Sequence, residues 1–246
     1  MKKVMMLMLA MVLLLGVSGQ ALAFFDDGNL IRVVYSSDGT MESATDLGSI
    51  TGLTSASTAN VIYNTNNFSL AQLGAGATLA TSYVAYFTAT LSPDQAWTSG
   101  SSASGQTGST GAFQGFVSSM HNALQTGYQL NGGLTNAMVT LATGDPNSYF
   151  KQLASVPGAL GGFLAQDNGA EKSLADLATV GYVDQYLYYY ASIPGRGSAT
   201  GLNVATIRTF ADGHTELNPT VPIPAAVYLL GSGLLGLVGI RRKMSV

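Results

Sequence analysis

Two uncharged apolar segments, one near each end of the 246-residue chain, limit the part that can form a globular fold. Residues 4–17 follow two lysines at the N-terminus, and residues 225–240 precede a basic C-terminal end. Removing both ends leaves residues 24–220, which is long enough to bury one sizeable core. We therefore expect a single domain over residues 24–220.

The N-terminal segment has the three parts of a secretory signal peptide over residues 1–23. A basic start and an apolar run lead to Ala21-Leu22-Ala23. Ala21 and Ala23 are the small residues that signal peptidase requires at the cleavage site. The apolar run is shorter than the roughly 20 residues of a membrane span, so a retained anchor is the weaker alternative. Cleavage after Ala23 would leave Phe24 as the first residue of the exported protein.

The C-terminal segment combines a proline motif, an apolar span and a basic end. The motif is Val221, Pro222, Ile223 and Pro224, and the basic residues are Arg241, Arg242 and Lys243. Between them, residues 225–240 would form a helix about 24 Å long, short of a hydrocarbon core of about 30 Å. The positive charges hold this end in the cytoplasm, which puts the domain on the far side of the membrane. We expect a transmembrane helix over residues 225–240 that anchors the protein transiently.

In their order and position, these three parts resemble the PEP-CTERM sorting domain over residues 221–243. In that family the tail is recognised by exosortase, a membrane cysteine protease or transpeptidase, in Gram-negative bacteria that make extracellular polysaccharide. The residue between the prolines is Ile223, where the family usually has Glu. The resemblance implies export, an intermediate tethered to the inner membrane, and sorting to the cell surface or the biofilm matrix. An ordinary single-pass anchor is the alternative.

The charge of the expected domain differs from that of the whole chain. All thirteen acidic residues lie in residues 24–220 with only five basic ones, a formal charge of −8 against −3 for the full sequence. Nucleic acid is therefore excluded as a partner, because phosphate binding needs clustered Lys and Arg. Cysteine is absent, so packing and hydrogen bonds must stabilise the domain without disulfides.

Two hairpins are predicted, one at each end of the domain, and both contain an Asp-Gly turn. Their strands are residues 30–35 and 40–46 in the first hairpin, and residues 204–210 and 214–217 in the second. One sheet that contains both hairpins is the simplest arrangement. It would bring the two ends of the domain together.

Helices are expected mainly between the hairpins. Residues 113–128 place apolar side chains at steps of three and four, which predicts a helix. The other expected elements are strands at residues 83–91 and 181–193, short helices at residues 147–155 and 171–178, and a mobile Gly/Ser/Thr-rich loop at residues 99–111. This order predicts an α+β fold: an antiparallel sheet with N- and C-terminal hairpins and helices inserted in the middle. A β-sandwich with helical insertions is the alternative.

The sequence contains no recognisable catalytic or metal-binding motif. His121 and His214 are the only histidines, and neither belongs to an H-E-x-x-H motif. The Asp- and Asn-rich segments at residues 26–29 and 167–171 do not match an EF-hand loop, and they are typical of ordinary turns. We therefore expect no catalysis, no cofactor and no metal site. A secreted hydrolase with an unrecognised site is one alternative.

One tyrosine-rich segment suggests a binding function. If residues 181–193 form a strand, Tyr182, Asp184, Tyr186, Tyr188 and Tyr190 share one face. Such a row of rings beside a carboxylate could stack on sugar rings, although aromatic residues in strands more often pack within the protein. The sequence thus predicts an exported matrix protein without catalytic activity. Its expected partners are signal peptidase, an exosortase-like enzyme, the membrane and extracellular polysaccharide. A carbohydrate-binding module is the main alternative.

Overall fold

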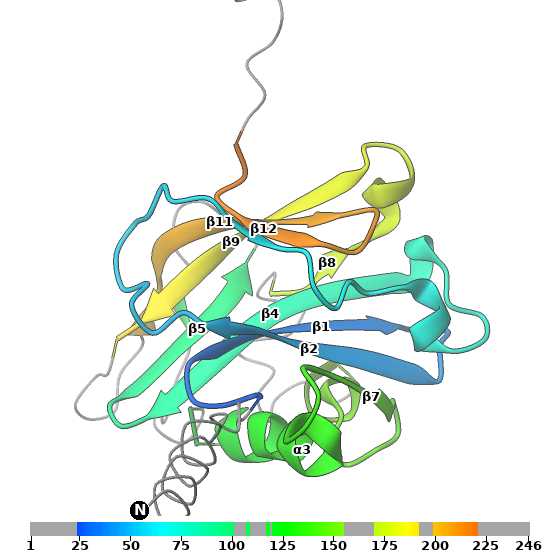
Figure 1. Ribbon diagram of the computed structural model, residues 1–246, viewed down its shortest axis with the longest axis horizontal. Coiled ribbons are helices and arrows are strands. Elements are labelled where there is room, and N and C mark those ends of the chain that lie inside the picture. Colours follow the sequence, from blue (N-terminus) through cyan, green and yellow to red (C-terminus); the bar gives the residue numbers. More distant parts are fainter. Residues whose placement is uncertain are drawn as a thin grey trace, which may run out of the picture.

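The computed structural model describes residues 24–100, 107–108, 117–118, 120–154, 170–191 and 199–220. These residues form a mostly antiparallel sheet that curls into a half-barrel, with few helices (Figure 1). The strand order is β3-β12-β11-β9-β5-β4-β1-β2-β7, and β8 pairs with β4 beside this path. One half of the curl consists of β9, β11, β12 and β3. The other half consists of β5, β4, β1, β2 and β7.

The strands of the sheet vary from two to ten residues in length. They are β1 (Asn29–Ser36), β2 (Met41–Ser49), β3 (Val61–Tyr63), β4 (Ser82–Leu91), β5 (Asp94–Gly100), β7 (Met138–Ala142), β8 (Lys172–Ser173), β9 (Tyr182–Tyr190), β11 (Leu202–Phe210) and β12 (Thr215–Leu217). A separate pair joins β6 (Thr107–Gly108) to β10 (Ala199–Thr200).

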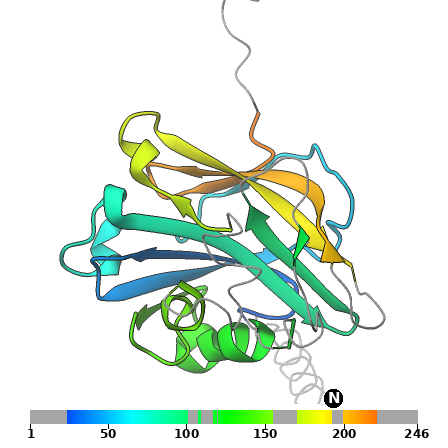
Figure 2. The same ribbon diagram turned by 180° about the vertical axis from the view of Figure 1, so that it is seen from behind.

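The helical residues among those described form one stretch of consecutive segments from residue 120 to residue 133 and several single turns. They are 3-10 turns at Leu70–Leu73, Leu79–Thr81 and Ala175–Ala178, π-helical turns at His121–Gln125, Gln129–Gly133 and Phe150–Ala154, and α3 (Thr126–Tyr128). The helical stretch that contains α3 lies against the outer side of β1, β2 and β4, as the view from behind also shows (Figure 2). The fold is therefore sheet-rich.

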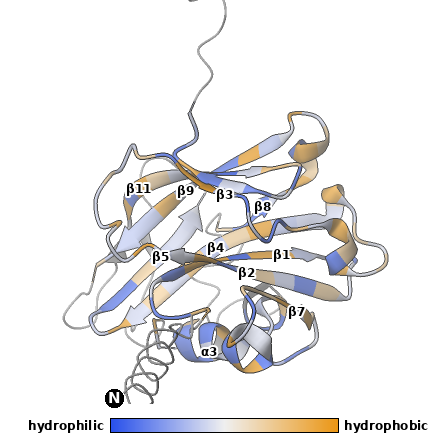
Figure 3. Cartoon of the chain, viewed as in Figure 1, coloured by the Kyte–Doolittle hydropathy of each residue, from blue (hydrophilic) through white to orange (hydrophobic). Residues whose placement is uncertain are grey.

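Strand β1 shows why the middle of the sheet is buried on both faces. Ile31 and Val33 point into an outer core, which lies between the sheet and the helical segments. Leu30 and Val34 point into an inner core, which lies inside the curl. Because successive side chains of a strand point to opposite faces, an almost continuous apolar run supplies both cores. Figure 3 shows hydrophobic residues, coloured orange, along β1 and the neighbouring strands.

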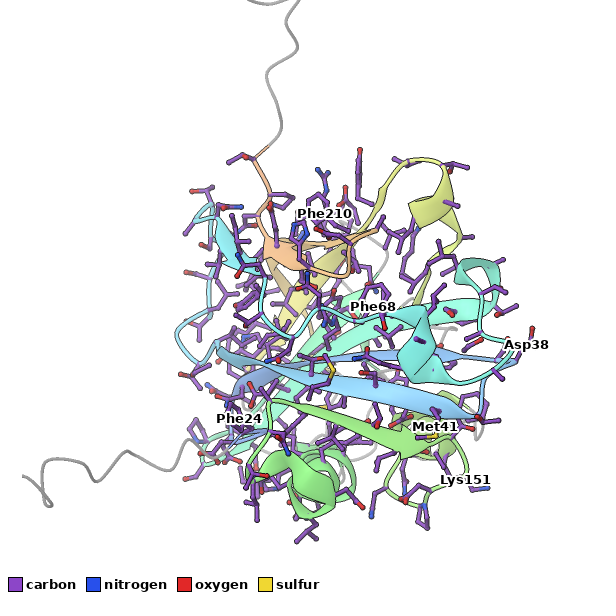
Figure 4. All side chains as sticks on the ribbon, turned by 45° about the vertical axis from the view of Figure 1, so that its right-hand side comes forward. Phe24, Asp38, Met41, Phe68, Lys151 and Phe210 are labelled. Atoms are coloured by element: carbon purple, nitrogen blue, oxygen red, sulfur yellow. The ribbon has the colours of Figure 1, made fainter. Side chains whose placement is uncertain are left out.

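A buried arginine joins the two halves of the curl across the inner core. The side chain of Arg32 is fully buried. Its Nη1 donates to the carbonyl of Gly213 at 2.7 Å and to Oγ1 of Thr215 at 3.1 Å. Its Nη2 donates to the carbonyl of Asn66 at 2.7 Å. Phe68, whose ring centroid lies 5.4 Å from the guanidinium carbon, is seen between the two halves in Figure 4.

The structure confirms much of the predicted strand pattern. Both predicted hairpins form and belong to one antiparallel sheet. The predicted strand at residues 83–91 is β4, and the predicted tyrosine-rich strand is β9. The predicted helix at residues 113–128 is helical at residues 117, 118 and 120–128, and residues 113–116 and 119 lie outside the described residues.

Two local predictions are corrected. Residues 171–178 do not form one short helix, because Lys172–Ser173 pairs with β4 as β8 and only Ala175–Ala178 is helical. The predicted loop at residues 99–111 begins too early. Ser99 belongs to β5, where its hydroxyl donates to the carbonyl of Ala170 at 2.5 Å. The helix predicted at residues 147–155 is present as Phe150–Ala154, and residue 155 lies outside the described residues.

No helix within the described residues is long and apolar enough to cross a membrane. The predicted signal peptide at residues 1–23 and the predicted span at residues 225–240 both lie outside the part of the chain that the structure describes.

Candidate functional site

The outer face of the sheet is partly exposed over β9, β11 and β12. Antiparallel pairing places Asp184 opposite Arg208 and Tyr186 opposite Thr206. Asp184 is exposed, and the other three side chains are half-buried. The flanking residues of β9 at alternate positions, Val183 and Leu187, point into the inner core. Strand alternation therefore presents a polar and aromatic row at the surface.

These four side chains line a groove of about 670 Å³. The rest of its wall consists of residues 57–58, from the loop before β3, and residues 218–220, which follow β12. The lining therefore combines hydroxyl, carboxylate, guanidinium and amide groups with one aromatic residue, Tyr186, which also packs against the outer core. Ligand sites usually combine a concave surface with a few placed polar groups in this way.

The charged pair in the groove has a fixed geometry. Arg208 donates from Nε to Oδ1 of Asp184 at 2.7 Å and from Nη2 to Oδ2 at 2.8 Å. The guanidinium carbon also lies 3.8 Å from the ring centroid of Tyr182. The hydrogen bonds to Asp184 raise the pKa of Arg208, so the guanidinium stays charged. Because the guanidinium of Arg208 lies over the Tyr182 ring, one face of that ring is covered by the protein itself.

Asn218 holds the far wall of the groove in place. Its backbone is left-handed, with φ of 47°, which Asn adopts more readily than most residues. Its N–H donates to the carbonyl of Thr206 at 2.7 Å, and its Oδ1 accepts from the Thr206 N–H at 3.0 Å. Its Nδ2 donates to the carbonyl of Ala59 at 3.1 Å. These bonds fasten both the loop before β3 and the end of β12 to β11.

The structure separates the five predicted binding residues into two groups. Tyr182, Asp184 and Tyr186 lie at the surface end of β9, and the last two line the groove. Tyr188 and Tyr190 are fully buried in the outer core, so their predicted contact with an external sugar is wrong for this structure.

The burial of these two rings has a clear physical reason. They lie opposite Thr98 and Ala96 of β5, whose outer side is part of the packed core. Gly201 closes over them, because a Cβ there would lie 2.8 Å from Cζ of Tyr190. The predicted aromatic face therefore continues from the surface into the interior along one strand.

A second aromatic group lies at the β11–β12 turn. The rings of Phe210 and His214 stack with centroids 4.0 Å apart, and Phe210 is labelled at this hairpin in Figure 4. Nδ1 of His214 contacts the carboxylate of Asp212, and its Nε2 lies 3.5 Å from Glu216. The other histidine, His121, contacts Asp27 at 2.5 Å. Among the described residues, no group of three or more His, Cys, Asp or Glu side chains could hold a metal ion.

Two buried carboxyl groups, which the sequence analysis missed, lie under the helical segments. Glu42 is fully buried on β2. It accepts hydrogen bonds from the hydroxyl of Tyr128 at 2.7 Å and from the N–H groups of Tyr149 and Phe150, both at 2.8 Å. Burial raises the pKa of Glu42 to about 7, although these donors oppose the shift.

Glu171 continues the same network. Its carboxylate accepts from the hydroxyl of Tyr35 at 2.7 Å and from the hydroxyl of Tyr149 at 2.9 Å. Burial raises the pKa of this carboxyl as well. Tyr149 thus links Glu171 to Glu42, and the network fastens the turn at Phe150–Ala154 to the sheet. The two acids are far apart in the sequence and share no motif, so only the fold brings them together.

Comparisons with protein-family models, with curated proteins and with solved structures find no match to this chain.

Proposed function

We propose that this chain is an exported protein of the cell surface or extracellular matrix, and that its domain binds polysaccharide in the groove over β9 and β11. One observation carries the binding part of the proposal. Tyr186 lines a groove together with the Asp184–Arg208 pair and several hydroxyl-bearing side chains. The proposed role is binding without catalysis.

The chemistry of the groove suits a sugar. The C–H face of a pyranose ring is apolar and packs on an aromatic ring, while its hydroxyl groups both donate and accept hydrogen bonds. Tyr186 offers the ring, and Ser57, Thr206 and Asn218 offer donors and acceptors at the sides. The bonds of Asn218 hold this arrangement before any ligand arrives, which reduces the entropy lost on binding.

The export part of the proposal rests on the two ends of the sequence. Residues 1–23 have the form of a signal peptide, and residues 221–243 resemble a PEP-CTERM sorting signal. Pro219 and Thr220, at the edge of the groove, directly precede Val221, where the proposed sorting signal begins. A polysaccharide bound in the groove would therefore lie close to the point at which the tail is removed.

Binding is tested with two substitutions at Tyr186 and a control substitution elsewhere on the surface. Tyr186→Ala should weaken binding to the polysaccharide of the producing organism by about tenfold or more, because the stacking surface is lost. Tyr186→Phe keeps the ring and should bind nearly as well as the wild type. Asp38→Asn, in the exposed turn between β1 and β2, is the control. Equal binding by Tyr186→Ala and wild type, with equal thermal stability, would contradict the proposed site.

Sorting is tested by intact mass spectrometry of the protein recovered from the producing cell. We expect an N-terminus at Phe24 and a C-terminus within residues 221–224. A mature protein that still carries Arg241, Arg242 and Lys243 would refute removal of the tail and favour a lasting anchor.

A further inference from the structure

The positive charge among the described residues that line the groove is already paired with a carboxylate. Arg208 is the only Lys or Arg in its described lining. Both Nε and Nη2 of its guanidinium already donate to Asp184, and the ring of Tyr182 covers one face of the group. Asp184 therefore occupies the Nε–Nη2 edge of the guanidinium, and only the Nη1–Nη2 edge is left for bidentate binding of an external carboxylate.

Negative charge surrounds this pair instead. Asp184, whose side chain is 41% exposed, faces the groove directly. Glu216 lies opposite Arg208 on β12, so the guanidinium has an acidic neighbour on each adjoining strand. Asp212 follows at the nearby turn, next to His214. Charges within about 8 Å act on one another at physiological salt, so an arriving anion meets net repulsion here.

We infer that the groove accepts polysaccharides without acidic groups and discriminates against uronic acid polymers. This inference rests on the proposed function and adds the class of sugar to it. Asp184 is the specificity-determining residue, because it both occupies the guanidinium and supplies the exposed negative charge. The formal charge of −8 over residues 24–220 acts in the same direction.

The test compares two oligosaccharides of equal length, one of glucose and one of mannuronate, by isothermal titration calorimetry. The wild type should bind the glucose oligomer and should bind the mannuronate oligomer at least about tenfold more weakly at low salt. Raising the salt concentration from about 20 mM to about 200 mM should strengthen mannuronate binding, because screening reduces repulsion. Binding of the glucose oligomer should stay unchanged.

Asp184→Asn gives a second, independent measurement. The substitution frees the guanidinium of Arg208, so affinity for the mannuronate oligomer should rise by about tenfold. Asp38→Asn removes the same charge at an exposed turn and should leave both affinities unchanged. If Asp184→Asn has a lower melting temperature, the salt titration of the wild type decides the question.

The outcomes separate this inference from the function on which it rests. Failure of the wild type to bind either oligomer would overturn polysaccharide binding itself. Equal or tighter binding of mannuronate by the wild type, or mannuronate affinity that falls as salt rises, would overturn the charge selection and leave the proposed function standing. A folded Asp184→Asn variant with no gain in mannuronate affinity would also overturn it.

Discussion

The buried carboxyl group of Glu42 should make the stability of this protein fall as the pH rises through neutrality. Burial raises its pKa from 4.5 to about 7 in the folded protein. Because the folded pKa is higher than the unfolded one, the stabilising contribution is complete below about pH 4.5. It is lost progressively until the pH exceeds about 7. A shift of about 2.5 units corresponds to about 3 kcal/mol in the free energy of unfolding.

The assay is urea unfolding at a series of pH values for the wild type and for Glu42→Gln. The amide resembles the protonated acid in charge and size, so the variant should lack the Glu42 contribution. Between pH 4.5 and pH 8 its free energy of unfolding should fall by about 3 kcal/mol less than that of the wild type. Glu171 is present in both proteins, so its contribution cancels in the comparison. Asp38→Asn, at an exposed position, controls for a general change in charge.

A wild-type curve parallel to that of Glu42→Gln over this pH range would refute the reasoning. It would mean that the hydrogen bonds from Tyr128, Tyr149 and Phe150 fully offset the free-energy cost of removing the Glu42 carboxylate from water.

Other substitutions test the packing inside the curl. Arg32→Met should lower the free energy of unfolding by about 3 kcal/mol, measured by urea denaturation, because the carbonyl groups of Gly213 and Asn66 lose their donor. Gly213→Ala should cost more than about 2 kcal/mol, since φ is 87° and a Cβ would lie 2.2 Å from the carbonyl of Phe68. Gly52→Ala, where a Cβ meets nothing within 4 Å, should change stability by less than about 0.5 kcal/mol in the same assay. Trp97 is the only tryptophan and is fully buried, so its fluorescence should shift to longer wavelength when the protein unfolds.

The local part of the fold was predictable from the sequence. Asp-Gly turns between β-rich runs predict hairpins because the turn and its strands are neighbours in the chain. The same holds for β4 and β9, whose residues are rich in tyrosine, valine and threonine.

Other strands were missed because their stability comes from distant partners. The segment Asp94–Gly100 contains few apolar residues, yet it forms β5 because the distant strand β9 pairs with it on the side opposite the preceding strand β4. Strand β7 (Met138–Ala142) and strand β3 (Val61–Tyr63) likewise form by pairing with β2 and β12. Such pairing depends on the whole topology, which a local pattern does not contain.

The candidate site was predictable only in part for a related reason. Strand alternation correctly places Tyr182, Asp184 and Tyr186 on one face of β9. It does not reveal that the outer core covers the same face at Tyr188 and Tyr190. The pairing of Asp184 with Arg208 also depends on the register between β9 and β11.

The contact between Arg32 and Thr215 joins residues that are 183 positions apart, and Asn60 contacts Leu217 over 157 positions. The curl therefore cannot close until almost all of residues 24–220 are available in one compartment. Folds with such distant contacts form slowly compared with those built from local ones. A chain that crosses a membrane from its N-terminus would therefore complete the curl only once β12 had reached the far side.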